Sequence, residues 1–411
     1  MWQELLWLFI LTTTLTGVAM GSLPGLSMNR ASLCTVGGTL LILSGAISQT
    51  AAFQAIDLDT LVLLLAMMVL NNHLRLAGFF AWVAHGTVAV RLPPRALLAL
   101  LMVVSGTLSA LFLNDTVVIA FTPLVLEVVL AVGLPTTPFL IALAVSANIG
   151  SVATLIGNPQ NMLIGIASGI PFTRFLTILW PVALGGVLIA WLILILLYRH
   201  PLAEPHRNLP TAPMPPLDLP LLKKSLLATL LLIGLLLAAM PVSLAALTAA
   251  SLLLISRRRS PEQIFQMVDW TLLLFFAALF VVTKGVETSG FSARLLALLT
   301  ADSSVTLPSL TVVSVLLSNL VSNVPAVLLL RPLVTELPWA ETAWLTLAMA
   351  TTLAGNLTLL GSVANLIVAE SARRHGVILS FAEYLRAGIP ITLATLAWGV
   401  YWLRGYLPPT P

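Results

Sequence analysis

The sequence predicts an all-α polytopic membrane protein made of two inverted repeats, each with five transmembrane helices and one re-entrant hairpin. Three observations lead to this fold class. Hydrophobic residues make up 59% of the 411-residue chain and charged residues only 8%, whereas soluble proteins carry about 25% charged residues. Apolar blocks of spanning length recur from one end of the chain to the other. Three motifs also recur in the same order on both sides of a proline-rich segment.

The composition argues against several other classes of protein. The single cysteine, Cys34, cannot form an intramolecular disulfide, and the five histidines show no metal-ligand spacing. The chain has no nucleotide-binding, metalloprotease or serine-hydrolase motif. We therefore predict no enzymatic activity, and no cofactor except Na⁺ or H⁺ as a coupling ion. The net charge of +4 indicates basic cytoplasmic loops rather than nucleic-acid binding.

The domain organisation follows from the repeated motifs. Residues 1–199 form the first repeat, residues 200–222 a cytoplasmic proline-rich linker, and residues 223–411 the second repeat. Asp57 and Asp269 are 212 residues apart in similar apolar contexts, and "LNDTVVIAFTPLV" matches "SNVPAVLLLRPLV" with an offset of 209. "ATLIGNPQNMLI" matches "LTLLGSVANLIV" with an offset of 204. Apolar helices resemble one another by chance in Leu and Val, but the matched Gly and Asn residues resist that explanation.

Each half is predicted to contain three helices, a re-entrant hairpin, an interrupted helix and a final helix. In the first half these elements are expected at residues 5–21, 33–53, 58–74, 96–133, 138–168 and 174–198. In the second half they are expected at 225–240, 242–256, 269–285, 306–336, 340–369 and 384–404. Residues 76–90 predict a helix lying at the cytoplasmic interface of the membrane.

The distribution of basic residues predicts the orientation. Five crossings per half is an odd number, so the second repeat must be inverted relative to the first. In this arrangement fourteen of the nineteen Lys and Arg residues fall on the side of the linker, and five on the other. Cytoplasmic loops are enriched in Lys and Arg. We therefore expect a multi-pass protein of the cytoplasmic (inner) membrane, with both termini outside the cell.

The interruption at residues 153–165, "ATLIGNPQNMLIG", predicts a binding site. Gly, Asn and Pro disfavour helix, and irregular backbone at membrane depth is tolerated only where it is buried or lines a wet cavity. Free carbonyls there could hold a cation, and the next half-helix could turn its N–H groups toward an anion. A proline kink that serves packing alone is the alternative. The candidate ligands at the two breaks are Thr154, Gly157, Asn158, Pro159 and Asn161, and Thr358, Gly361, Ser362 and Asn365.

The hairpin tips supply a second set of candidate ligands. The first tip carries Asn114, Asp115 and Thr116, and the second carries Ser322, Asn323 and Pro325. The position equivalent to Asp115 is Val324, and a carboxylate within the membrane indicates function. Asp115 could bind Na⁺, carry a proton, or act as the N-cap of the second hairpin arm. The candidate Na⁺ ligands are Asn114, Asp115 and Asn323.

Charged residues also lie in the outer parts of the hairpins. Glu127 and Glu336 are 209 residues apart near the two hairpin exits, where solvated interface positions are expected. Arg331 lies deeper in its arm, and it either extends outward to the interface or offsets the charge of a substrate.

These motifs resemble the ion transporter superfamily over nearly the whole chain. The resemblance rests on "NDTVVIAFTPLV", "SNVPAVLLLRPLV", "ATLIGNPQNMLIG" and "FAEYLRAGIP". This superfamily includes arsenite efflux permeases, divalent anion:sodium symporters, citrate–metal transporters and a sodium/proton antiporter branch. The symporters carry Ser-Asn-Thr at both tips, and here only the Asn matches at both, so the tips look closer to the arsenite permease and antiporter side. The resemblance implies a homodimer with an elevator mechanism, in which 93–199 and 301–411 move against a scaffold of 1–92 and 200–300.

The function predicted from these observations is secondary active transport of a small inorganic or organic anion or oxyanion, coupled to Na⁺ or H⁺. The second candidate is a cation/proton (Na⁺/H⁺) antiporter centred on Asp115. An ion channel is disfavoured because two opposed hairpins suit an occluded site rather than a continuous pore. The lipid bilayer and a second copy of the chain are the other expected partners.

Overall fold

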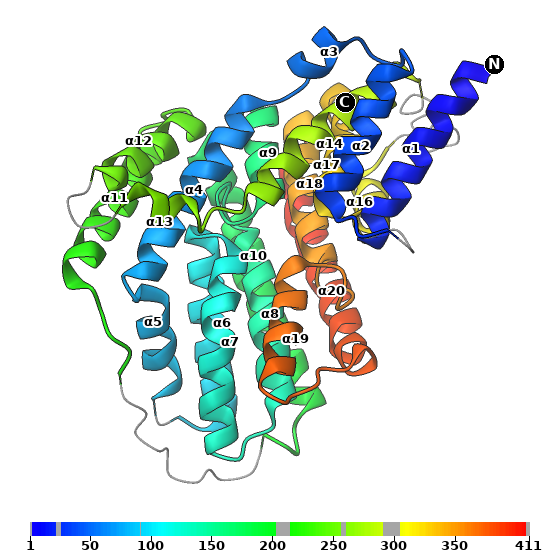
Figure 1. Ribbon diagram of the computed structural model, residues 1–411. Helices are drawn as coiled ribbons and strands as arrows, with labels where there is room; N and C mark the ends of the chain where they lie inside the picture. The colour runs from blue at the N-terminus through cyan, green and yellow to red at the C-terminus, as the bar shows by residue number, and fades with distance from the viewer. Residues whose placement is uncertain are drawn as a thin grey trace.

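The computed structural model describes residues 2–21, 26–90, 92–202, 214–255, 260–290 and 305–407. Within these ranges every regular element is a helix (Figure 1). The first half contains α1 Trp2–Met20, α2 Arg30–Leu43, α3 Gln49–Gln54, α4 Leu58–Leu76, α5 Phe79–Val88, α6 Pro94–Leu111, α7 Asn114–Ala131, α8 Thr136–Ser151, α9 Pro159–Ser168 and α10 Phe172–Leu197. The second half contains α11 Leu219–Leu237, α12 Val242–Leu254, α13 Pro261–Phe265, α14 Trp270–Thr288, α16 Leu307–Val321, α17 Asn323–Glu336, α18 Ala340–Ala354, α19 Val363–Arg374 and α20 Phe381–Leu403.

The prediction of an all-helical polytopic membrane protein is confirmed. Seven helices of the described ranges are long and apolar enough to cross a membrane: α1, α4, α6, α7, α10, α11 and α14. Many large apolar side chains on these helices face outward, such as Leu188 and Leu196 of α10, which are 54% and 71% exposed. An outward apolar surface of this kind is expected where lipid tails, rather than water, surround the helices.

Capping residues set where several helices begin. Asp57 precedes α4 and its carboxylate accepts the Thr60 backbone N–H at 3.0 Å, and Asp269 precedes α14 and accepts the Leu272 N–H at 2.9 Å. An N-cap carboxylate satisfies one of the four backbone donors that a helix start leaves open. The two aspartates that matched in sequence therefore have the same structural role.

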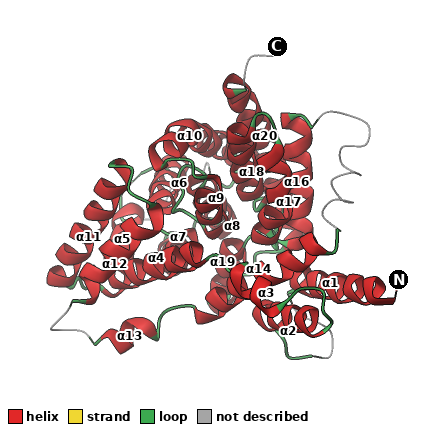
Figure 2. Cartoon of the chain, turned by 90° about the horizontal axis from the view of Figure 1, so that it is seen from above, coloured by secondary structure: helices red, strands yellow, loops and turns green. Residues whose placement is uncertain are grey.

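Helices of the first half pack on helices of the second half. α2 packs on α14, and α12 packs on α4. Seen from above, α4, α11 and α12 lie on one side, α1, α2 and α3 lie on the opposite side, and α8, α9 and α18 lie toward the middle (Figure 2). The hairpin arms α6 and α7 pack on α8, the arms α16 and α17 pack on α18, and α10 packs on α20.

Two predicted boundaries are wrong. The helix expected at 33–53 is divided into α2 and α3, because Gly45 takes a left-handed conformation with φ +76° and Ser48 caps a new helix. The linker expected at 200–222 ends earlier, because Asp218 caps α11, which begins at Leu219. Residues 203–213 of this linker lie outside the described ranges, as do Arg91, Arg207, Arg294 and residues 257–259.

The segment 76–90, whose position at the membrane interface stays a prediction, contains the helix α5. This helix lies beside the hairpin arms α6 and α7 (Figure 1). The rings of Phe79 and Phe80 contact the ring of Phe112 near the hairpin tip, with centroids 6.0 and 5.4 Å apart. Aromatic edge-to-face pairs and apolar burial therefore hold α5 on the hairpin.

Candidate transport site

The break between α8 and α9 is organised by two asparagines. The side chain of Asn158 caps α9 by accepting the Asn161 backbone N–H at 2.8 Å, and Pro159 occupies the first helical position, where its missing N–H does no harm. The Asn161 side-chain amide donates to the carbonyl oxygens of Ser151 at 2.9 Å and Thr154 at 3.0 Å. The Asn161 amide therefore satisfies two of the carbonyls at this break, and cation binding by the others stays a prediction.

The break between α18 and α19 repeats this arrangement. The Asn365 side-chain amide donates to the carbonyl oxygens of Gly355 at 2.7 Å and Thr358 at 3.1 Å. Ser362 caps α19 by accepting the Ala364 N–H at 3.2 Å. Each of these donors and acceptors lies 204 residues after its counterpart at the first break, apart from the N–H that Ser362 accepts.

The two breaks are joined to one another across the centre of the molecule. The Asn148 Nδ2 donates to Asn365 Oδ1 at 3.0 Å, and the Thr352 hydroxyl donates to Asn161 Oδ1 at 3.4 Å. Asn148 and Thr352 are themselves 204 residues apart. Each break asparagine thus accepts a hydrogen bond from the equivalent position of the other half.

Asn148 is the centre of this network, although the sequence did not single it out. It is 2% exposed. Its Nδ2 also donates to Asn356 Oδ1 at 2.9 Å, and its Oδ1 accepts from the Ser362 hydroxyl at 3.0 Å and the Asn114 Nδ2 at 3.1 Å. An amide with its donors and acceptors satisfied in a buried site specifies one arrangement of its neighbours. The offset of 204 between Asn148 and Thr352 was the sequence signal that could have found it.

The first hairpin tip is docked on the first break. The Asn114 backbone N–H donates to the Gly157 carbonyl at 3.1 Å, and the Thr154 hydroxyl donates to the Ala110 carbonyl at 2.5 Å. A Cβ at Gly157 would lie 2.7 Å from the carbonyl oxygen of Ser109. Gly157 therefore permits the close backbone approach that places the tip against the break.

The second tip is docked on the second break by different groups. The Asn319 amide donates to the Ala354 carbonyl at 3.2 Å, and the Asn323 Oδ1 accepts from the Ser318 hydroxyl at 2.6 Å. Pro325 is buried in the first turn of α17. Ser322 connects the two arms with φ +81° and ψ 160°, a region that only glycine adopts without strain. A Cβ at Gly361 would lie 3.2 Å from the Asn319 Oδ1.

Asp115 lies at the first tip but outside this network. The N-cap of α7 is Leu113, which argues against the N-cap role among the three alternatives for Asp115. Asp115 and Thr116 are half-buried in the first turn of α7, where a carboxylate is favoured by the helix dipole. Among the described residues no hydrogen bond or ion pair engages the Asp115 carboxylate.

The structure brings most of the predicted site residues together, but not all. Asn114, Thr154, Gly157, Asn158, Asn161, Thr358, Ser362 and Asn365 lie in or directly against the Asn148 network. The arms α7 and α17, which begin at the two tips, do not pack along one another. Within the described residues, no bond connects Asn114 or Asp115 to Asn323, so the three candidate Na⁺ ligands remain a hypothesis.

The fold and this site define a class of protein, a polytopic membrane transporter with two broken helices at its centre. Residues 6–354 match the protein family described as Citrate transporter. The chain therefore belongs to this family, which confirms the predicted superfamily, and it is a transporter and not an enzyme.

Individual relatives agree with this assignment. The chain is 34% identical to the silicon efflux transporter LSI3 of Oryza sativa subsp. japonica, over 92% of this chain and 93% of the relative. It is 27% identical to the putative transporter arsB of Dictyostelium discoideum, over 91% and 87%. Two solved structures share the fold at low identity. The YdaH transporter of Alcanivorax borkumensis has a TM-score of 0.58 at 16% identity, covering 98% of this chain and 97% of its own. MtrF of Neisseria gonorrhoeae has a TM-score of 0.55 at 14% identity, covering 98% and 95%.

Proposed function

We propose that the protein is a secondary active transporter of a small anion or oxyanion, coupled to Na⁺ or H⁺. The observation that supports it most is the pair of helix breaks whose polar contacts correspond at an offset of 204 and cross between the halves through Asn148 and Thr352. A central site formed by discontinuous helices from two repeats is typical of secondary transporters.

The positions of the helix starts favour an anion as the substrate. α7 begins at the first tip and α9 at the first break, and the tip and the break are in contact through Asn114 and Gly157. α17 and α19 begin at the second tip and break. Each helix N-terminus carries roughly half a positive charge, so four helix starts around one centre favour a negatively charged ligand. The family description, Citrate transporter, agrees with such a ligand.

The proposed mechanism is an elevator. The two halves, 1–199 and 223–411, are inverted repeats, and the mobile part comprises 93–199 and 301–411. Contacts of α6 and α7 with α8, and of α16 and α17 with α18, make the proposed mobile part a continuous packing unit. A homodimer held by the remaining helices would provide a fixed reference for its movement.

The orientation in the cytoplasmic membrane remains part of the proposal. The linker faces the cytoplasm and both termini face the outside, because fourteen of nineteen basic residues fall on the linker side. Reporter fusions after Arg207 and at Pro411 test this, and reporters active on the same side contradict it.

Transport assays in proteoliposomes test the function itself. A panel of small anions is first screened by thermal shift with and without Na⁺, since a ligand that binds the folded state raises its Tm. Uptake of each binding anion is then driven by a Na⁺ gradient or a pH gradient. Saturable uptake against a concentration gradient is expected for one of the two drives.

The second candidate function, a cation/proton antiporter, rests on Asp115. Its half-buried carboxylate has no partner among the described residues. Exchange of Na⁺ for H⁺ in vesicles that contain no transportable anion would favour this candidate and contradict anion transport.

A further inference from the structure

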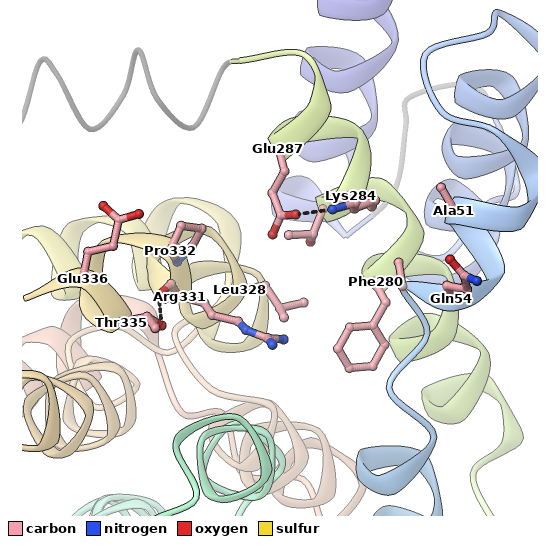
Figure 3. Close-up of a pocket in the computed structure, with 12 residues that line it drawn as sticks. Ala51, Gln54, Phe280, Lys284, Glu287, Leu328, Arg331, Pro332, Thr335 and Glu336 are labelled. Atoms are coloured by element: carbon pink, nitrogen blue, oxygen red, sulfur yellow. Dashed lines mark hydrogen bonds and ion pairs between the residues drawn. The ribbon is translucent and has the colours of Figure 1, made fainter.

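A crevice of about 690 Å³ lies between α3, α14 and α17, outside the Asn148 network. α17 is the second arm of the second hairpin, and α14 and α3 belong to the proposed scaffold. Glu336 of α17 and Glu287 of α14 line the outer part, and Leu328 and Phe280 line the part nearest the hairpin tip (Figure 3).

Two basic and two acidic side chains of the described residues line this crevice, and only one basic–acidic pair among them is in contact. Lys284 is neutralised by Glu287, whose carboxylate lies 3.0 Å from the Lys284 amine. Arg331 extends from α17 between Leu328 and Phe280, and its guanidinium points into the open space (Figure 3). No described residue forms an ion pair or a side-chain hydrogen bond with that guanidinium. The Glu336 carboxylate points away from it (Figure 3).

This geometry decides between the two roles left open for Arg331. A side chain that extends to the interface would follow its own helix outward to water, whereas the guanidinium here crosses toward α14 (Figure 3). A guanidinium that faces open space with its five N–H donors unused is suited to bind a carboxylate or oxyanion with two parallel hydrogen bonds.

The crevice also leads toward the proposed transport site. Leu328 is five residues after Asn323 on the same helix, which corresponds to about 7.5 Å at the helical rise of 1.5 Å per residue. Leu328 and Phe280, which are both buried, line the crevice on this side.

We propose that this crevice is the access vestibule for the transported anion on one side of the membrane, and that Arg331 is the residue that selects negative charge there. The ligand class is a small carboxylate or oxyanion that a guanidinium can bind in two-point fashion. This inference rests on the proposed anion transport. The Arg331 guanidinium, which has no acidic partner among the described residues, raises the local concentration of an anion beside it, and salt screens the effect.

The test measures KM and kcat for uptake of an anion that the wild type transports, in right-side-out and in inside-out vesicles. R331Q is expected to raise KM about five-fold at low ionic strength in one orientation only, with kcat unchanged, and the difference should vanish near 1 M salt because screening is then strong. R331K keeps the charge but loses the two-point geometry, so it should raise KM less than R331Q does. E336Q, which removes a negative charge at the same mouth, should lower KM.

Arg174→Gln is the matched control, because it removes one exposed positive charge whose partner is Glu341 at 2.7 Å, outside the crevice. The vestibule role would be overturned by any of three results. These are an equal rise of KM in R174Q, an R331Q effect that does not depend on salt or orientation, and a fall in kcat alone. Failure of the proposed function would give a different result. The wild type would then transport cations and no anion, and R331Q would lower the KM for the cation.

Discussion

The two halves of the molecule are alike at the central helix breaks. They differ at the rim, by which we mean the region where the hairpin arms α7 and α17 face α4 and α14. At the centre, Asn161 and Asn365 make corresponding hydrogen bonds at an offset of 204. At the rim, α14 and α17 pack together and share a crevice, whereas the equivalent helices α4 and α7 do not pack along one another. The first hairpin tip instead contacts α5, which begins only after α4 has ended.

Buried side chains of α4 show the same difference. Thr283 and Lys284 line the crevice beside α17. The residues 212 positions earlier are Asn71 and Asn72, which are buried and whose side-chain N–H groups have no partner among the described residues. Unpaired buried amides are unfavourable. In the proposed elevator, displacement of the mobile part along the helix axes would account for this difference, and we expect the reverse displacement to open a second crevice that hydrates these amides.

Trapping that second crevice would have the largest effect. The crevice residues Phe280 and Leu328 correspond to Met68 and Ile119, at offsets of 212 and 209. In a Cys34→Ala background, M68C/I119C is expected to form a cross-link with a short bifunctional reagent only while the protein turns over, and transport should then cease. Cross-linking is read from gel mobility and transport from uptake. If the active variant never forms this cross-link, Met68 and Ile119 do not come together as Phe280 and Leu328 do, and the proposed correspondence is wrong.

Loss of the central asparagine is expected to have the next largest effect. Asn148→Ala leaves several buried partners unpaired, each at about 1–3 kcal/mol, so we expect a lower Tm and about a hundredfold loss of uptake. Thr352→Val removes the equivalent group, whose bonds are longer, at 3.3 to 3.4 Å, so its effect should be about tenfold smaller. Equal losses in the two variants would show that the network is not centred on Asn148.

The break asparagines should behave as a matched pair. Asn161→Ala and Asn365→Ala each remove an amide that ties two backbone carbonyls. We expect similar reductions of uptake, about tenfold to thirtyfold, in protein that still reaches the membrane. Uptake is measured per folded protein, with fluorescence-detected size exclusion as the control for folding. Wild-type uptake kinetics in either variant would show that the corresponding helix break serves packing only.

Asp115 has no counterpart in the second half, where Val324 occupies its position. Asp115→Asn keeps the size and most of the hydrogen-bonding capacity but removes the charge. With proton coupling, the variant should lose the pH dependence of uptake and the ability to concentrate substrate, while exchange continues. With Na⁺ coupling, the apparent Na⁺ affinity should fall instead, because a carboxylate–cation attraction is lost. Gradient-driven uptake and counterflow across pH and Na⁺ concentration distinguish these outcomes, and accumulation equal to the wild type would remove the coupling role.

The sequence predicted the helix breaks well and their contacts poorly, for a physical reason. Gly157 and Pro159 interrupt an apolar block, and local backbone preferences are enough to place such a break. Asn148 lies inside a regular helix and depends on partners more than two hundred residues away. Only the packing of the two halves makes those contacts, so no local pattern identified them.

The same limit applies at the rim. The count of crossings predicted an interfacial helix at 76–90, and the edge-to-face contacts of Phe79 and Phe80 with Phe112 form only when the hairpin is in place. Arg331 was recognised as unusual in the sequence. The α3 and α14 walls of the crevice, which decide where its side chain points, come from elements far along the chain.

The smallest expected effect compares the backbone of the two hairpin tips. Ser322 has φ +81° and ψ 160°, whereas Leu113, 209 residues earlier, has φ −58° and ψ 124°. Strain of this kind amounts to about 1–3 kcal/mol, and glycine relieves it while adding about 0.4–1 kcal/mol of freedom to the unfolded chain. Ser322→Gly should therefore raise the Tm slightly, and Leu113→Gly should lower it, because an unstrained and buried side chain is lost. Thermal unfolding in detergent measures both. A lower Tm for Ser322→Gly would show that its side chain, and not its backbone, holds the second tip in place.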